Sequence, residues 1–175
     1  IATASHLKKI NPSVEVIIIE QSSVVGYIGS SLNLYLEKYV EHLEDCRTTS
    51  PSELLTMGIN VMINTRVTKV VPDKKQIEIV MKDEAVVIKD VLRYDYLVLA
   101  MGSSQYQTSF SEEAQSKITS YKSLPQAKAA AETLENCQKV VIIGAGLIGF
   151  ELAESLSRLK KQVILLDRMN RSLFR

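Results

Sequence analysis

The residues with the clearest chemical spacing in this chain are the glycines of a GAGLIG hexapeptide near the C-terminus, a GxGxxG pattern. Gly144 permits a tight turn, Gly146 lets the backbone approach a pyrophosphate, and Gly149 lets a helix pack closely on a strand. The N-terminus of that helix offers N–H groups and a positive dipole end to phosphates. Asp167, about 20 residues further on, is placed to accept hydrogen bonds from ribose hydroxyls. Its charge repels a 2′-phosphate, which predicts NADH over NADPH, although the neighbouring Arg168 weakens that preference.

Two strands and a helix must hold this turn in place. Residues 140–143 and 163–166 are aliphatic runs of strand length on either side of it. The helix between them has one apolar face, formed by Ile148, Leu152, Leu156 and Leu159. This order predicts a parallel βαβ unit over residues 139–167. A glycine-rich structural turn in an α/β protein that binds no nucleotide is the alternative.

The N-terminal part predicts half of a second such unit. Helical spacing over residues 1–10 ends at Asn11-Pro12, and a buried strand is expected over residues 14–19. The strand closes on an acid, Glu20. A helix followed by an acid-capped strand is the second half of a βαβ unit, so we expect a strand and a glycine-rich turn to precede Ile1 in a longer protein.

The middle of the chain predicts a mixture of short helices and strands. The turn Gly26–Ser31 is followed by an amphipathic helix whose expected inner face is Leu32, Leu36, Tyr39, Val40 and Leu43. A capping box at 50–53 begins a helix that ends near Gly58. A strand at 60–63, a meander at 67–71, 76–81 and 85–88, and a buried strand at 94–100 follow. A later helix capped at Ser123 has Ala127, Ala130, Ala131 and Leu134 on its inner face.

Composition excludes several classes of protein. The formal net charge is +1 and the basic residues are scattered, so no nucleic-acid partner is expected. No aliphatic run approaches the roughly 20 residues that cross a bilayer. Cys46 and Cys137 fit no CxxC or metal-ligand spacing, and a reducing, cytoplasmic setting with no metal site is expected.

The whole chain resembles the pyridine nucleotide-disulfide oxidoreductases, within them the group of NADH oxidases, NADH peroxidases and coenzyme A-disulfide reductases that use a single cysteine. The matching stretches are residues 16–20, 49–61, 94–103 and 140–154. The resemblance implies an α/β fold of two Rossmann-like FAD/NAD(P)-binding units with a β-meander, both incomplete in this chain.

The resemblance also implies a division by cofactor. Residues 1–103 would be an FAD-binding domain that lacks its first strand and glycine turn. Residues 104–120, which are polar and without clear period, would be a linker, and residues 121–175 would begin the NADH-binding domain.

The resemblance assigns roles to individual residues. On the FAD side, Glu20 would hold the ribose and Val67 the adenine edge, with the strand end Ala100-Met101-Gly102 lying against the cofactor. On the NADH side, Glu151 would lie near the nicotinamide end. The NADH-binding residues would be Gly144, Gly146, Leu147, Ile148, Gly149 and Asp167.

Three departures from the family pattern affect the expected chemistry. The redox-cysteine position falls on Ser30, and a serine forms neither a sulfenate nor a disulfide. Leu147 stands where relatives commonly have a flavin-gating tyrosine, and Met101 replaces a threonine. Cys46 lies beyond the helix expected from Leu32, on the order of 15 Å from the Ser30 turn at 1.5 Å per residue, too far to replace the missing thiol.

The resemblance implies that the full-length protein is an FAD-dependent NADH oxidoreductase. Hydride would pass from NADH to flavin and on to a small-molecule acceptor such as oxygen, peroxide or a disulfide. We expect a cytoplasmic homodimer, and expect the 175-residue chain alone to be inactive. A non-catalytic nucleotide-binding or redox-sensing module without the redox cysteine is the second hypothesis. An NAD-linked dehydrogenase without flavin is disfavoured by residues 94–103 and the meander before them.

Overall fold

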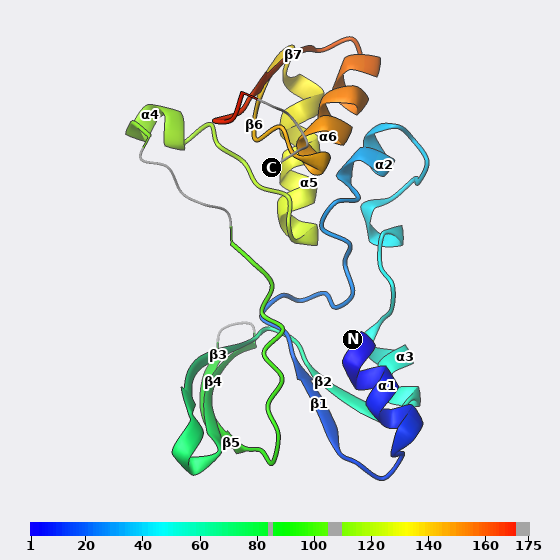
Figure 1. Ribbon diagram of the computed structural model, residues 1–175, viewed down its shortest axis with the longest axis vertical. Coiled ribbons are helices and arrows are strands. Elements are labelled where there is room, and N and C mark those ends of the chain that lie inside the picture. Colours follow the sequence, from blue (N-terminus) through cyan, green and yellow to red (C-terminus); the bar gives the residue numbers. More distant parts are fainter. Residues whose placement is uncertain (84–85, 105–109, 171–175) are drawn as a thin grey trace. The chain divides into compact units, whose positions relative to one another are not determined.

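The computed structural model describes residues 1–83, 86–104 and 110–170 (Figure 1). Its chain divides by packing into two compact units. Unit 1 contains Ile1–Gly26 and Arg47–Gln105, and unit 2 contains Tyr27–Cys46 and Tyr106–Arg175. This grouping follows contacts between residues, whereas the sequence-predicted domains follow cofactors, so the division by cofactor stays a prediction.

The first part of unit 1 is a parallel strand pair with two helices against it. β1 (Val16–Ile19) pairs with β2 (Ile59–Met62) from Val16↔Ile59 to Ile19↔Met62. The helices α1 (Ala2–Ile10) and α3 (Pro51–Thr56) both contact this pair. Their shared core consists of Ala4, Val25, Leu54 and Ile59. The expected helix at 1–10 and the strands near 14–19 and 60–63 are confirmed.

The start of α3 shows how local sequence determines a helix boundary. The Ser50 hydroxyl accepts from the Glu53 N–H at 3.2 Å, and a Glu53 carboxylate oxygen accepts from the Ser50 N–H at 2.7 Å. This is the expected capping box, with Pro51 at the first helical position. Gly58, at φ +74°, follows the helix as predicted.

A three-stranded antiparallel meander completes the regular structure of unit 1. It runs in the order β3 (Thr65–Val71), β4 (Gln76–Asp83), β5 (Val86–Arg93), with the short turn η2 (Pro72–Lys74) between the first two strands. Its buried residues include Thr65, Ile77 and Ile79. The expected meander is confirmed.

The strand expected at 94–100 is wrong, because this segment is irregular. A strand is stabilised by ladder hydrogen bonds to a neighbour, and none of the sheets among the described residues includes this segment. Its apolar side chains, which suggested a buried strand, are therefore exposed, and Tyr96 is 94% accessible.

Unit 2 contains a second parallel strand pair, in which β6 (Lys139–Ile143) pairs with β7 (Gln162–Leu166) from Lys139↔Gln162 to Ile143↔Leu166. The helix between them is α6 (Leu147–Arg158), whose Leu152 and Leu156 are buried. α5 (Leu124–Asn136) precedes β6, and its buried face is Leu124, Ala127, Ala130, Ala131 and Leu134. The short helix α4 (Glu112–Gln115) lies before α5. The expected βαβ unit and the inner face of α5 are confirmed.

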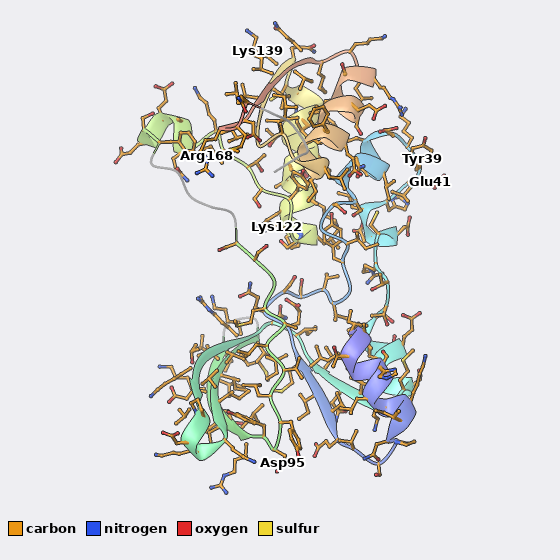
Figure 2. The ribbon with its side chains drawn as sticks, viewed as in Figure 1. Tyr39, Glu41, Asp95, Lys122, Lys139 and Arg168 are labelled. Atoms are coloured by element: carbon orange, nitrogen blue, oxygen red, sulfur yellow. The ribbon has the colours of Figure 1, made fainter. Side chains whose placement is uncertain are left out.

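The amphipathic helix expected from Leu32 to Leu43 is shorter than its pattern suggested. α2 (Leu32–Leu36) ends after five residues, and Lys38 adopts φ +61°. The reversal leaves Tyr39 72% accessible, and Figure 2 shows it on the outer side of the loop. Leu43 is buried in η1 (Leu43–Asp45), which contacts α5. Leu43 is therefore buried through η1 and not, as expected, on the face of a longer helix.

Candidate functional site: a dinucleotide turn and an adjoining pocket

The glycine turn between β6 and α6 has the geometry that its sequence requires. Gly144 adopts φ +111°, and its N–H donates to the Leu166 carbonyl at 2.7 Å. A Cβ built at Gly149 would overlap the carbonyl oxygen of Gly144, so a larger residue would require the helix and the turn to move apart. No heavy atom beyond its chain neighbours lies within 4 Å of a Cβ built at Gly146, so that side of the turn is open.

The first turn of α6 has no side-chain cap. Its N-cap is Gly146, which has no side chain to accept from the helix N–H groups, and Leu147 is the first helical residue. Leu147 and Ile148 are 66% and 53% accessible, so the helix start is exposed at this point. An uncapped, exposed helix N-terminus beside an open glycine turn fits an anionic ligand such as a pyrophosphate.

Asp167 is hydrogen-bonded to the same turn. Its Oδ2 accepts from the Ala145 N–H at 2.6 Å, and its Oδ1 accepts from the Met169 N–H at 2.8 Å. The carboxylate therefore lies at the mouth of the glycine turn, at the end of β7. Figure 2 labels Arg168, the exposed cation that follows Asp167. Asp167 and Ala145, which are 22 residues apart in the sequence, are therefore in contact in the structure.

A shallow pocket in unit 2 brings together two further site residues. It is lined by Ser30 and Asn33, by Tyr121, and by Ile148, Glu151 and Leu152 of α6. Ser30 and Glu151 therefore share one surface. Burial raises the pKa of Tyr121, and the negative charge of Glu151 raises it further. Sequence reasoning missed Asn33 and Tyr121, because neither belongs to a local motif.

The turn before Ser30 is tied to distant parts of unit 2. A Cβ at Gly29 would lie 3.2 Å from the Lys122 carbonyl oxygen. The Ile28 N–H donates to the Cys46 carbonyl at 3.0 Å. The expectation that Cys46 lies on the order of 15 Å from this turn is wrong, since α2 ends early and the chain returns. Cys46 is nevertheless buried, and both cysteines are free thiols.

The residues assigned to FAD lie in unit 1. The Glu20 Oε1 accepts from the Ser22 N–H at 2.8 Å, and its carbonyl accepts from the Thr65 N–H at 2.9 Å. β3, which carries Val67, therefore begins beside Glu20, the residue that directly follows β1. Val67 is half-buried at a register shift in β3.

The remaining FAD-side residues are Ala100, Met101 and Gly102, which are exposed in the irregular segment after β5. Met101 is 83% accessible and Gly102 adopts φ +70°. These three residues were expected at the end of a strand over residues 94–100. Because that strand does not form, they do not lie at a strand end.

An interhelical polar cluster in unit 2 was not foreseen from sequence. The Ser155 hydroxyl lies 2.5 Å from Glu37 Oε1, and Arg158 Nη1 donates to Glu37 Oε2 at 2.6 Å. Arg158 Nη2 donates to Glu154 Oε1 at 2.6 Å. The only sequence signal for the cluster is the i,i+4 spacing of Glu154 and Arg158. Glu37 could not be added without the tertiary structure.

Two classes of site find no support in the part of the chain that the structure describes. No group of three or more His, Cys, Asp or Glu side chains in the described ranges could hold a metal ion. Over the same residues, none of the helices combines the length and apolar character required of a bilayer span.

Comparison with known proteins finds a family match over the full sequence. Residues 1–175 match the family model described as pyridine nucleotide-disulphide oxidoreductase. The NADH oxidase of Lactococcus lactis subsp. cremoris is 27% identical over 175 residues, covering 99% of this chain and 39% of that protein.

Solved structures show the same relationship. The water-forming NADH oxidase from Lactobacillus brevis bound to NADH superposes with a TM-score of 0.88 at 28% identity, over 98% of this chain and 38% of that one. The NAD-dependent persulfide reductase from A. fulgidus gives 0.85 at 26% identity, over 97% and 32%. The chain thus spans less than half the length of the relatives it matches, and its expected Rossmann-type α/β class is confirmed.

Proposed function

The chain belongs to the pyridine nucleotide-disulphide oxidoreductase family, and from this premise we propose that the full-length protein is an FAD-dependent NADH oxidoreductase. The observation that carries the proposal is the hydrogen bond from the Ala145 N–H to Asp167, because it joins the acid that would bind ribose to the turn that would bind phosphate. The relatives named above act on or bind NAD(H), which supports the same cofactor here.

The residues of unit 2 suit NADH in three places. The open side of Gly146 and the uncapped start of α6 would face the pyrophosphate. The exposed Asp167 carboxylate would accept from the adenosine ribose, and its charge would oppose a 2′-phosphate. Glu151, in the pocket with Ser30, would lie at the nicotinamide end.

The residues of unit 1 suit the FAD ribose and adenine in part. Glu20 is anchored at the end of β1 by the Ser22 N–H and is half-buried, which suits a carboxylate that accepts from a ribose hydroxyl. Val67 lies nearby at the start of β3, and Ala100, Met101 and Gly102 are accessible to a ligand. FAD would supply the two-electron redox chemistry at this site.

Ser30 determines which acceptor we propose. A serine hydroxyl cannot store electrons as a thiol does, so peroxide or disulfide reduction through this residue is disfavoured. We therefore propose molecular oxygen as the acceptor. With one flavin carrying two electrons, the balanced reaction is NADH + H⁺ + O₂ giving NAD⁺ + H₂O₂. A cytoplasmic, homodimeric protein remains part of the proposal.

Anaerobic titration of the purified full-length protein with NADH tests this function. We expect bound flavin to bleach completely after one NADH per active site, and one H₂O₂ per NADH to form when air is admitted. Uptake of four electrons would reveal a thiol partner and refute the role assigned to Ser30. A protein that retains flavin but does not bleach with NADH would be a non-catalytic module.

A further inference from the structure

The polar cluster between α2 and α6 joins residues that are 118 positions apart in the sequence. Glu37 follows directly after α2, while Ser155 and Arg158 belong to the last turns of α6. Both carboxylate oxygens of Glu37 are used, Oε1 by the Ser155 hydroxyl at 2.5 Å and Oε2 by Arg158 at 2.6 Å. We call Glu37, Ser155 and Arg158 the interhelical cluster.

Two of the three side chains in the cluster are enclosed, whereas that of Arg158 is 56% accessible. Ser155 is fully buried, and the side chain of Glu37 is only 16% accessible. Hydrogen bonding from Ser155 lowers the pKa of Glu37, and the charge of Arg158 lowers it further. Arg158 also pairs with Glu154, so its guanidinium is held by two carboxylates. The contacts of Glu37 with Ser155 and with Arg158 together link the end of α2 to α6 at two points.

The cluster is connected, through α6 and α2, to Glu151 and Ser30, two of the residues that line the pocket. Ser155 follows Glu151 by four residues, one turn along α6, and its hydroxyl lies 2.9 Å from the Glu151 carbonyl oxygen. On the other side, Glu37 closes the short helix that begins directly after Ser30 and Ser31. Fixing Glu37 on Ser155 therefore fixes the turn that carries Ser30 against the part of α6 that carries Glu151.

We propose that Glu37 is a positioning residue for hydride transfer, which holds Glu151 against the Ser30 turn by means of Ser155 and Arg158. The inference rests on the proposed function, since it concerns the nicotinamide end of the same site. The adenosine half of NADH would contact the glycine turn and Asp167, at the other end of α6. Loss of the cluster should therefore impair the chemical step and leave binding of the adenosine half unchanged.

The first variant to test is Arg158→Glu in the full-length, flavin-loaded protein. It places a third carboxylate beside Glu37 and Glu154, so repulsion should separate α2 from α6. Because a misplacement of about 1 Å can cost on the order of 100-fold in rate, we expect at least a tenfold fall in the flavin reduction rate at saturating NADH. The Kd for ADP-ribose, which lacks nicotinamide, should change less than about twofold.

The second variant reverses both charges, as Glu37→Arg with Arg158→Glu. Arg at 37 would face carboxylates at 158 and 154, so we expect the reduction rate to return to within about threefold of the unmodified protein. Lys117→Glu is the matched control, because it makes the same charge change in the exposed pair with Glu113. Lys117→Glu should change neither the flavin reduction rate nor the Kd for ADP-ribose.

Hydrogen exchange gives a readout that does not depend on activity. Amides of residues 27–36 should exchange faster in Arg158→Glu and regain protection in the double variant. A different result would overturn the proposal: Arg158→Glu weakens ADP-ribose binding and lowers thermal stability along with the reduction rate, and the double variant restores none of the three. The cluster would then have a merely structural role.

The unmodified protein separates this inference from the function on which it rests. If NADH does not bleach its flavin, the proposed function fails and the role in hydride transfer fails with it. If bleaching is normal and Arg158→Glu reduces flavin at the unmodified rate, only the positioning role is overturned.

Discussion

The two units of this chain each end a parallel strand on an acid, and the two acids have the same local geometry. Glu20 follows β1 in unit 1 and accepts from the N–H of Ser22 at 2.8 Å. Asp167 follows β7 in unit 2 and accepts from the N–H of Met169, also at 2.8 Å. In both cases the acid closes a small turn on the backbone two residues ahead.

The difference lies in the second partner. Asp167 also accepts from Ala145 in the glycine turn, so acid, turn and helix start form one site. For Glu20, the described donor to the carboxylate is Ser22, and its backbone instead joins β3. The contact with the glycine turn is the feature that supports the predicted nucleotide role of Asp167, and Glu20 has no such contact among the described residues. This explains why unit 2 supports the stronger functional statement.

The largest expected effect comes from adding one methyl group to Gly149 in the glycine turn of unit 2. Gly149→Ala forces a Cβ into the Gly144 carbonyl, and backbone cannot give way as a side chain does. We expect a loss of about 3 kcal/mol in stability and NADH binding too weak to measure by calorimetry.

Gly58→Ala in unit 1 is the matched control for that change. Its Cβ would meet the flexible end of Lys8, at 2.9 Å from Cε, so its cost is mainly the strain of φ +74°. We expect about 1–2 kcal/mol and normal NADH binding. Similar losses of NADH affinity in both variants would contradict the comparison of the two units.

A smaller effect is expected from neutralising each acid without changing its shape. Asp167→Asn keeps an acceptor for Ala145 but removes the charge. Charged hydrogen bonds contribute about 1.5–3 kcal/mol, so the ratio of kcat/KM for NADH over NADPH should fall roughly tenfold or more. Glu20→Gln should leave this ratio within about twofold. Steady-state rates with both nucleotides measure it, and equal shifts in the two variants would refute the assignment of Asp167.

The smallest effect concerns pH and compares two serine-bound glutamates. Hydrogen bonding from Ser50 lowers the pKa of Glu53 in unit 1, and hydrogen bonding from Ser155 lowers that of Glu37 in unit 2. A carboxylate with a lowered pKa stabilises the fold above its unfolded pKa. That contribution is lost as the pH falls through the folded pKa.

Glu37→Gln and Glu53→Gln should therefore each flatten the acid limb of unfolding stability, below about pH 4.3. Thermal melts across pH 2.5–7 measure this. Only Glu37→Gln should also lower the flavin reduction rate, because Glu53 caps α3 in the other unit. An acid limb unchanged by both substitutions would show that neither hydrogen bond is maintained in solution.

Sequence alone was sufficient wherever a few neighbouring residues determine the structure. Three features have a pattern that can be recognised within a short stretch of sequence: the capping box at Ser50, the inner face of α5 and the glycine turn at 144–149. The roles of Gly144, Gly146, Gly149 and Asp167 came from the motif and those of the other cofactor-site residues from family resemblance. All of these roles stay predictions, whereas the family itself is confirmed.

Only the tertiary structure decided the features that depend on distant partners. Residues 94–100 have the composition of a strand, but a strand exists only with a neighbour. The helix from Leu32 ends at Leu36. The chain then turns back, so that Leu43 is buried and the Cys46 carbonyl accepts from the Ile28 N–H. Likewise Glu37 meets Ser155 and Arg158 through contacts that no local pattern predicts. Periodicity records which face of a segment is apolar, whereas the partner of that face is set by the packing of the whole unit.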